Sequence, residues 1–463
     1  PTGYRYSAVT KRYRVVEEEK DELPENIQVK FQNRQGDELS ETLDLPTNST
    51  PEDLNSLLHQ LLSQGDESDK KIPYSFYVSV KEEADTEVLT SLSELIASHK
   101  LSTEGTLKLT YQPLALFRVR PVTRCTDTLY GHTEAVLHVR YAPHGQWLAS
   151  GGGDTTVRFW DVHTSTTKFI CREHKDHVLC TSWSPDGLRF ASGDKRGILI
   201  VWNPTVAKCL KNFKAHSQWI TGLAWEPLHR CQSNACERLA TSSKDCTIRL
   251  WNTRTGSSNT LSGHTDSVEA VIWSGEGLLY SASRDRTIKV WNVNRCILVR
   301  TLTGHGHRVN TLALSSETVL RTGPFDYKNT KFPNTESMIK VAKEKYEAFR
   351  SLHGEDTLVS GSDDFTLFVW HPETSKLPVK RLTGHQQAVN YISFSPDARY
   401  FASASFDRKV KLWNGKTGDF IHTLTGHVGA VYQLAWSADS RYLVSASKDS
   451  TAKLWEIPSG KRA

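Results

Sequence analysis

The sequence lacks long apolar runs, and several common catalytic signatures are missing from it. No stretch approaches the ~18 consecutive apolar residues that a membrane-spanning helix needs. No G-x-S-x-G, P-loop, G-x-G-x-x-G or H-E-x-x-H motif occurs in the 463 residues. We therefore expect neither a membrane partner nor a small-molecule substrate. The chain begins with Pro1 and has no apolar signal core, which favours a processed chain or a fragment.

Cysteines are few and irregularly spaced, and no C-x-x-C pair is present among the eight. This pattern indicates reduced thiols in a cytosolic or nuclear protein rather than a disulfide framework. Cys231 and Cys236 could form half of a zinc site, but no second half with ligand spacing follows. We expect no metal within the chain and no cofactor of its own.

The charge differs between two parts of the chain. Residues 1–120 hold 14 Lys and Arg against 21 Asp and Glu, whereas residues 121–463 hold 43 against 31. The net charges are therefore −7 and +12. All 13 Trp and all eight Cys also follow residue 120. Such a change of composition marks a domain boundary, and opposite charges suggest two different partners.

The second part repeats a unit that runs from a His to a Trp. The seven units are His132 to Trp160, His174 to Trp202, His216 to Trp251, His264 to Trp291, His305 to Trp370, His385 to Trp413 and His427 to Trp455. The spacing is 27 or 28 residues except in the third and fifth units, where it is 35 and 65. These two units carry insertions, at about 229–237 and 316–355. Short apolar strands alternate with Asp, Gly and Ser turns within a unit, which predicts antiparallel hairpins.

A Ser or Thr ten residues before the Trp, and an Asp six before it, recur with the His. In the first and last units these sets are His132, Ser150, Asp154 and Trp160, and His427, Ser445, Asp449 and Trp455. A catalytic triad occurs once in an active site, whereas this set repeats and ends on an indole donor. We therefore interpret it as a structural network and expect no catalytic residues. The second unit has Arg196 in place of the Asp, so its network should be incomplete.

These repeated sets resemble those of the WD-repeat β-propellers. The resemblance predicts an all-β propeller over residues 122–463. Seven repeats are visible, and only Glu456 to Ala463 follow the last Trp. Either residues 126–130 pair with the last blade to close seven blades, or an eighth repeat has been removed.

The first part predicts a small α+β domain over residues 24–121. Alternating apolar residues indicate strands near residues 27–31, 43–45, 73–80 and 107–111. Thr50 followed by Pro51 predicts the start of a helix, and leucines near residues 89–96 predict a second one. The order β-β-α-β-α-β looks like a ubiquitin-like domain, whose fold favours a binding role. Residues 1–23 have no apolar period and predict a flexible tail, or alternatively a nuclear-import patch at Lys11, Arg12 and Arg14.

The order of the two domains, together with internal stretches such as Trp225 to His229 and Gly361 to Phe368, resembles the Notchless family of ribosome-assembly factors. The insertion from Thr335 to Leu352 is also similar, and its residues Ile339, Ala342, Tyr346 and Phe349 would line one face of a helix. Members of this family have eight blades, which favours the removed repeat.

The resemblance implies a partner for each domain. It implies that the ubiquitin-like domain binds the metal-ion-dependent adhesion site of midasin, an AAA ATPase, and that Glu104 completes the coordination of the Mg²⁺ that midasin holds. The propeller would anchor in the precursor of the large ribosomal subunit, in the nucleolus and nucleoplasm of the nucleus. Midasin would then transmit force through this non-enzymatic chain to release factors.

The basic propeller is suited to ribosomal RNA or to proteins bound to it. Residues that follow each Gly-His pair line one face of such a propeller, so we expect partner contacts at His177, Trp219 and Arg308. A signalling or ubiquitin-pathway scaffold adaptor is the alternative function: the propeller would capture a target and the ubiquitin-like domain would recruit a ligase or proteasome.

Overall fold

A computed structural model provides the fold of the chain. The residues that it describes are 24–33, 38–39, 42–62, 74–78, 86–88, 91–99, 105–113, 127–231, 236–326, 330 and 332–457. The predicted tail, residues 1–23, and Glu104 lie outside the described residues. The chain divides into two compact units, Pro1–Arg118 and Val119–Ala463. No helix among the described residues has the length and apolar character needed to cross a membrane.

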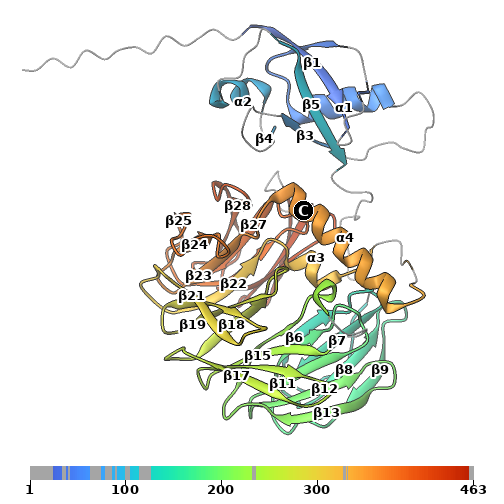
Figure 1. Cartoon of the computed structure of the whole chain (residues 1–463), viewed down its shortest axis with the longest axis vertical. Coiled ribbons are helices and arrows are strands. Elements are labelled where there is room, and N and C mark those ends of the chain that lie inside the picture. The colour runs from blue at the N-terminus through green and yellow to red at the C-terminus, as the bar shows by residue number, and fades with distance from the viewer. Residues whose placement is uncertain are drawn as a thin grey trace, which may run out of the picture. The chain divides into compact units, whose positions relative to one another are not determined.

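The first unit is a five-stranded sheet with two helices (Figure 1). Its elements are β1 (Asn26–Gln32), β2 (Leu43–Pro46), α1 (Pro51–Leu62), β3 (Tyr74–Val78), β4 (Thr86–Glu87), α2 (Leu92–His99) and β5 (Leu107–Pro113). The strand order is β2-β1-β5-β3-β4, with β1 parallel to β5 and the other pairs antiparallel. The predicted α+β, ubiquitin-like fold class is confirmed. The two-residue strand β4 was not predicted.

Helix α1 begins where the sequence predicts, because Thr50 and Asp53 cap it reciprocally. The Thr50 backbone N–H donates to the Asp53 carboxylate at 3.0 Å, and the Asp53 N–H donates to the Thr50 hydroxyl at 3.4 Å. Leu54 and Leu58 of the helix are fully buried against the sheet residues Phe31 and Phe76. This packing fixes the helix on one face of the sheet.

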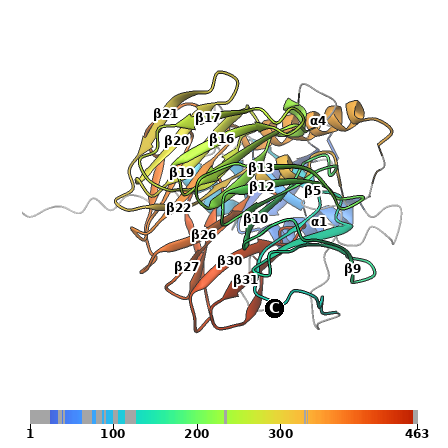
Figure 2. The same ribbon diagram turned by 90° about the horizontal axis from the view of Figure 1, so that it is seen from below.

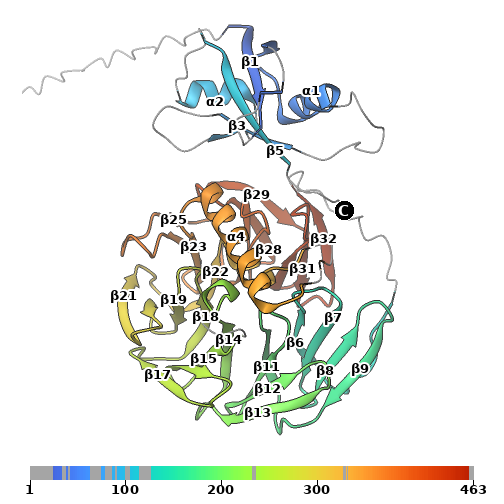
Figure 3. The same cartoon turned by 45° about the vertical axis from the view of Figure 1, so that its right-hand side comes forward.

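The described residues of the second unit form seven antiparallel sheets arranged around a centre (Figure 3). The first four sheets are β6 (Val136–Tyr141), β7 (Trp147–Gly152), β8 (Val157–Asp161) and β9 (Thr166–Cys171); β10 (Val178–Trp183), β11 (Phe190–Asp194), β12 (Ile198–Asn203) and β13 (Lys208–Lys214); β14 (Ile220–Trp225), β15 (Arg238–Ser243), β16 (Thr247–Asn252) and β17 (Ser258–Ser262); β18 (Val268–Trp273), β19 (Leu278–Ser283), β20 (Thr287–Asn292) and β21 (Ile297–Thr303). The last three are β22 (Val309–Leu314), β23 (Leu358–Ser362), β24 (Leu367–Trp370) and β25 (Lys380–Leu382); β26 (Val389–Phe394), β27 (Tyr400–Ser405), β28 (Lys409–Asn414) and β29 (Phe420–Thr425); β30 (Val431–Trp436), β31 (Tyr442–Ser447) and β32 (Ala452–Glu456). The predicted propeller is confirmed, with one sheet for each of the seven repeats.

The sheets follow one another around the propeller in sequence order (Figure 2). Each innermost strand packs beside the innermost strand of the next sheet, from β6 to β30. Apolar residues of neighbouring sheets form shared clusters; one of these includes Phe159 of β8 and Trp202 of β12. The core of the propeller therefore lies between the sheets, and each repeat depends on its neighbours.

Apolar side chains of the first and last sheets are exposed, unlike those at equivalent positions between two sheets. Val136 of β6 is 49% exposed, whereas Val178, at the same position of β10, is fully buried. Tyr432 of β30 and Val444 of β31 are 43% and 38% exposed. The described residues 127–130 form no strand and Tyr130 is 83% exposed, so of the two alternatives these residues do not support pairing with the last blade.

Both insertions follow an innermost strand and leave their sheets complete. The first contains the 3-10 helix η2 (Leu228–Arg230), and the second contains α3 (Glu317–Thr322) and α4 (Thr335–His353). As predicted, one face of α4 packs inward: Ala342, Tyr346 and Phe349 are buried and Ile339 is half-buried. The Tyr346 ring stacks on His229 at 4.6 Å and lies so close to Gly275 that a Cβ there would collide with it.

Candidate partner-binding face of the propeller

Four side chains in each blade form one hydrogen-bonded network. In the first blade, His132 Nδ1 lies 2.9 Å from Asp154, its Nε2 lies 2.7 Å from the Ser150 hydroxyl, and the Trp160 indole donates to that hydroxyl at 2.8 Å. An indole N–H only donates, so the Ser150 oxygen accepts from Trp160 and donates its own proton to Nε2. His132 Nδ1 then carries the proton that the carboxylate accepts.

The same geometry recurs around the propeller. The other sets are His174, Asp194, Ser192 and Trp202; His216, Asp245, Thr241 and Trp251; His264, Asp285, Ser281 and Trp291; His305, Asp364, Ser360 and Trp370; His385, Asp407, Ser403 and Trp413; and His427, Asp449, Ser445 and Trp455. Their Nδ1 to carboxylate distances run from 2.7 to 3.1 Å. Buried polar groups stabilise a fold when all of them are paired, as the His, Ser or Thr, Asp and Trp groups are here. Seven copies of this paired network are therefore suited to a structural role.

The second blade corrects the prediction of an incomplete network. Asp194, at the end of β11, takes the place of the missing carboxylate and lies 3.1 Å from His174 Nδ1. Its other oxygen accepts from the backbone N–H groups of Arg196 and Ile198. Arg196 instead points to Asp176, 3.3 Å from its Nε. An Asp two residues before the expected position was the signal that the sequence interpretation missed.

The Asp residues also hold the turns of this face. Asp407 Oδ2 accepts from the Gln386 backbone N–H, and its Oδ1 accepts from that of Lys409. Although burial opposes its ionisation, the hydrogen bond from His385 lowers the pKa of Asp407 to about 2. The loop that carries each His is thereby tied to the turn of the next hairpin in the same blade.

His177, Trp219 and Arg308 occupy equivalent positions on this braced face. The backbone carbonyl of each accepts a hydrogen bond, at 3.0 or 3.1 Å, from a residue just before or within the turn of its blade. These donors are Lys195, Lys244 and Asp363. The structure therefore brings the three predicted contact residues to one face, in the second, third and fifth blades.

The surroundings of these three residues differ in charge. Trp219 is 42% exposed, and the Lys195 and Lys244 ammonium groups lie 5.0 and 4.8 Å from its ring centroid. Neither lysine forms an ion pair with a described residue. Arg308, in contrast, is half-buried and paired with Asp363 through its Nε. Positive charge therefore lies beside the aromatic ring of Trp219, whereas His177 is half-buried.

The cysteine pair of the first insertion is the other site that the sequence raised. The Cys231 and Cys236 sulfur atoms lie 3.6 Å apart as free thiols. No group of three or more metal-ligating side chains occurs among the described residues, which exclude 232–235 between the two cysteines. The hydrogen bond with Cys231, followed by burial, raises the pKa of Cys236, so this thiol stays protonated.

Both units match described protein families. Residues 27–96 match the family described as the NLE (NUC135) domain. Six segments match the WD domain, G-beta repeat: 123–161, 165–203, 207–252, 256–292, 376–414 and 418–456. The fifth unit, with its long insertion, is not among them.

Several proteins are similar over most of their length. Protein Notchless of Drosophila melanogaster is 42% identical over 388 residues, 82% of this chain and 77% of that protein. Notchless protein homolog of Arabidopsis thaliana is 48% identical over 84% of this chain and 80% of its own. Ribosome assembly protein 4 of Saccharomyces cerevisiae is 42% identical over 87% of this chain and 80% of that protein. With an NLE domain, WD repeats and this identity over more than four fifths of its residues, the chain belongs to the family of Notchless and ribosome assembly protein 4.

Proposed function

We propose that the chain is a non-enzymatic assembly factor of the large ribosomal subunit, acting in the nucleolus and nucleoplasm. The observation that carries this proposal is its similarity to proteins of two fungi that are named ribosome assembly protein 4. The repeated Ser-His-Asp sets support a role without catalysis, because each hydroxyl is engaged by a buried indole N–H and is closed to a substrate.

The propeller is the part that anchors the chain in the precursor subunit. Its face presents Trp219 between two lysines on a rigid, braced framework, and the segment 121–463 has a net charge of +12. Aromatic residues on rigid elements are suited to be binding hot spots, and positive charge steers them to a polyanionic particle. His177 and Arg308 extend the contact to the second and fifth blades.

The N-terminal domain is the part that binds midasin. In this proposal Glu104 supplies a carboxylate oxygen to the Mg²⁺ held by the adhesion site of midasin, and ATP hydrolysis by midasin supplies the force for factor release. A hard cation with exchangeable water positions accepts such an oxygen readily. Glu104 lies outside the described residues, so its role rests on the family resemblance of its motif.

The test is Mg²⁺-dependent binding of the full chain to the isolated adhesion-site domain of midasin. Glu104→Gln keeps the shape of the side chain and removes its charge, so we expect it to weaken binding at least tenfold. Asp44→Asn, an exposed carboxylate on β2, is the matched control and should bind like the unaltered chain. Binding that persists in EDTA or in Glu104→Gln would overturn the metal bridge and favour the adaptor function.

A further inference from the structure

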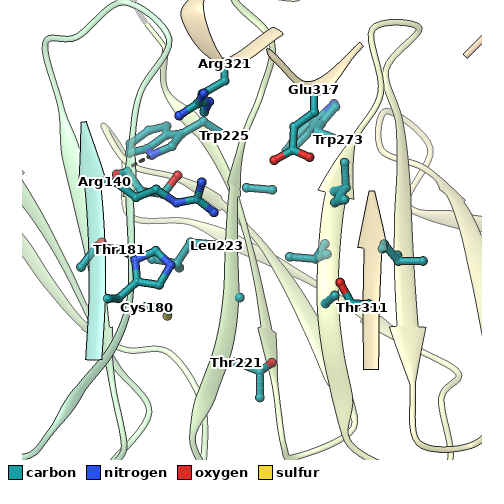
Figure 4. Close-up of a pocket in the computed structure, with 18 of the residues that line it drawn as sticks. Arg140, Cys180, Thr181, Thr221, Leu223, Trp225, Trp273, Thr311, Glu317 and Arg321 are labelled. Carbon is teal, nitrogen blue, oxygen red and sulfur yellow. Dashed lines mark hydrogen bonds between the residues drawn. The ribbon is translucent and has the colours of Figure 1, made fainter. Parts of the chain in front are cut away.

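A cavity of about 310 Å³ lies between the innermost strands of the propeller. Residues of six innermost strands, β6, β10, β14, β18, β22 and β26, form its wall, and α3 of the second insertion lies over one part of it. Trp183, Trp225 and Trp273 contribute aromatic side chains to its wall. Figure 4 shows Trp225 and Trp273 close to α3. A cavity of this size is at the lower end of the range of small-molecule sites, roughly 300–1,000 Å³.

Two arginines and one glutamate reach into this cavity from distant parts of the chain. Arg140 comes from β6, and Glu317 and Arg321 come from α3 (Figure 4). No salt bridge joins either arginine to a carboxylate within the part of the chain that the structure describes. The Arg321 side chain is exposed and lines the cavity, so a small solute can reach its guanidinium.

The charges in the cavity do not cancel. Burial and the positive charge of Arg140 lower the pKa of Arg321, while Glu317 opposes this effect; arginine nevertheless stays protonated at neutral pH. Although burial opposes its charge, Tyr391 of the wall and Glu317 raise the pKa of Arg140, so this guanidinium also stays charged. Burial lowers the pKa of His138 to about 3, so it is neutral, and Glu269 is paired with Arg284. Two guanidinium groups therefore face one carboxylate.

We propose that this axial cavity binds a small phosphate-type oxyanion between Arg140 and Arg321. A guanidinium presents a planar fork of N–H donors that matches the oxygens of phosphate, and two such groups on the wall of one cavity attract the same anion. Glu317 limits the affinity, because its carboxylate competes with the ligand for the same donors. The site is independent of the proposed ribosomal function, since none of its residues belongs to the His177, Trp219 and Arg308 face.

The test is calorimetric titration of the full chain with inorganic phosphate at pH 7.5, and in parallel with adenosine monophosphate. We expect one site for phosphate. Tighter binding of the nucleotide would show that the cavity takes a phosphate ester, and equal or weaker binding would assign it to the free ion. A chain that takes up neither compound at 10 mM, about the highest useful concentration for a weak site, overturns the proposal.

Three variants separate this site from a merely structural role. Arg321→Met should weaken phosphate binding at least tenfold, whereas Glu317→Gln should strengthen it severalfold because the competing charge is gone. Arg254→Met, at an arginine that is 74% exposed outside the cavity, removes the same charge and should leave binding unchanged. Equal binding by Arg321→Met and the unaltered chain, or weaker binding by Glu317→Gln in a folded protein, would refute the site.

Discussion

Ser403→Ala tests whether the repeated networks brace the propeller. The Ser403 hydroxyl is fully buried, accepts from the Trp413 indole at 2.9 Å and lies 2.8 Å from His385 Nε2. Its loss leaves two buried polar groups without partners, and each costs about 1–3 kcal/mol. We therefore expect the protein to lose about 2–6 kcal/mol of stability, more than an ordinary surface substitution loses.

Urea unfolding followed by tryptophan fluorescence, together with hydrogen exchange in β26 to β28, measures this loss. Ser393→Ala is the matched control in the same sheet, since the Ser393 hydroxyl makes only one long hydrogen bond of 3.5 Å; it should change stability by less than about 0.5 kcal/mol. In a Trp413→Phe background the indole N–H is absent, so Ser403→Ala should cost less there. Equal costs for Ser403→Ala and Ser393→Ala would refute the brace.

Three further predictions concern pH and partners. Because hydrogen bonding lowers the folded-state pKa of Asp407 to about 2, below the ~3.9 of an unfolded chain, its stabilisation is complete above ~pH 4 and is lost as pH falls toward 2; urea midpoints should fall over this window, and less so in Asp407→Asn. Trp219→Ala should weaken co-sedimentation with precursor large subunits by about 2 kcal/mol, roughly thirtyfold in Kd, while Phe420→Ala, an exposed aromatic on β29, should have no effect. Arg308→Ala should weaken it less, because Asp363 already neutralises that charge. Equal effects of Trp219→Ala and Phe420→Ala would exclude the proposed face.

Local patterns predicted most of the elements. The alternation of Ile27, Val29 and Phe31 predicted β1, and the spacing of Ala342, Tyr346 and Phe349 predicted the buried face of α4. These succeed because burial imposes a period of two on a strand and of about 3.6 on a helix. Strand β4 has only two residues, too few to show any period, and was missed.

Features set by tertiary structure were outside the reach of the sequence. Asp194 stands two residues before the expected position, and only the folded hairpin shows that its carboxylate reaches His174 Nδ1 from the end of β11. The cavity is a stronger case: Arg140 and Arg321 belong to the first and fifth blades, and only closure of the sheets around one axis brings both to it. No spacing rule connects residues so far apart in the chain.

The repetition itself points to where function is located. In all seven blades the backbone of one position accepts the same hydrogen bond from the turn of its own blade, so the framework there is constant. The residues at this position are Ala135, His177, Trp219, Ser267, Arg308, Ala388 and Ala430. The fold needs only the backbone at this position, because three of the blades have alanine there. A Trp or an Arg at this position is therefore not required by the fold. The larger side chains at this position are therefore the first to substitute in a test of partner binding. Trp219 is the strongest candidate, because two lysines lie over its ring.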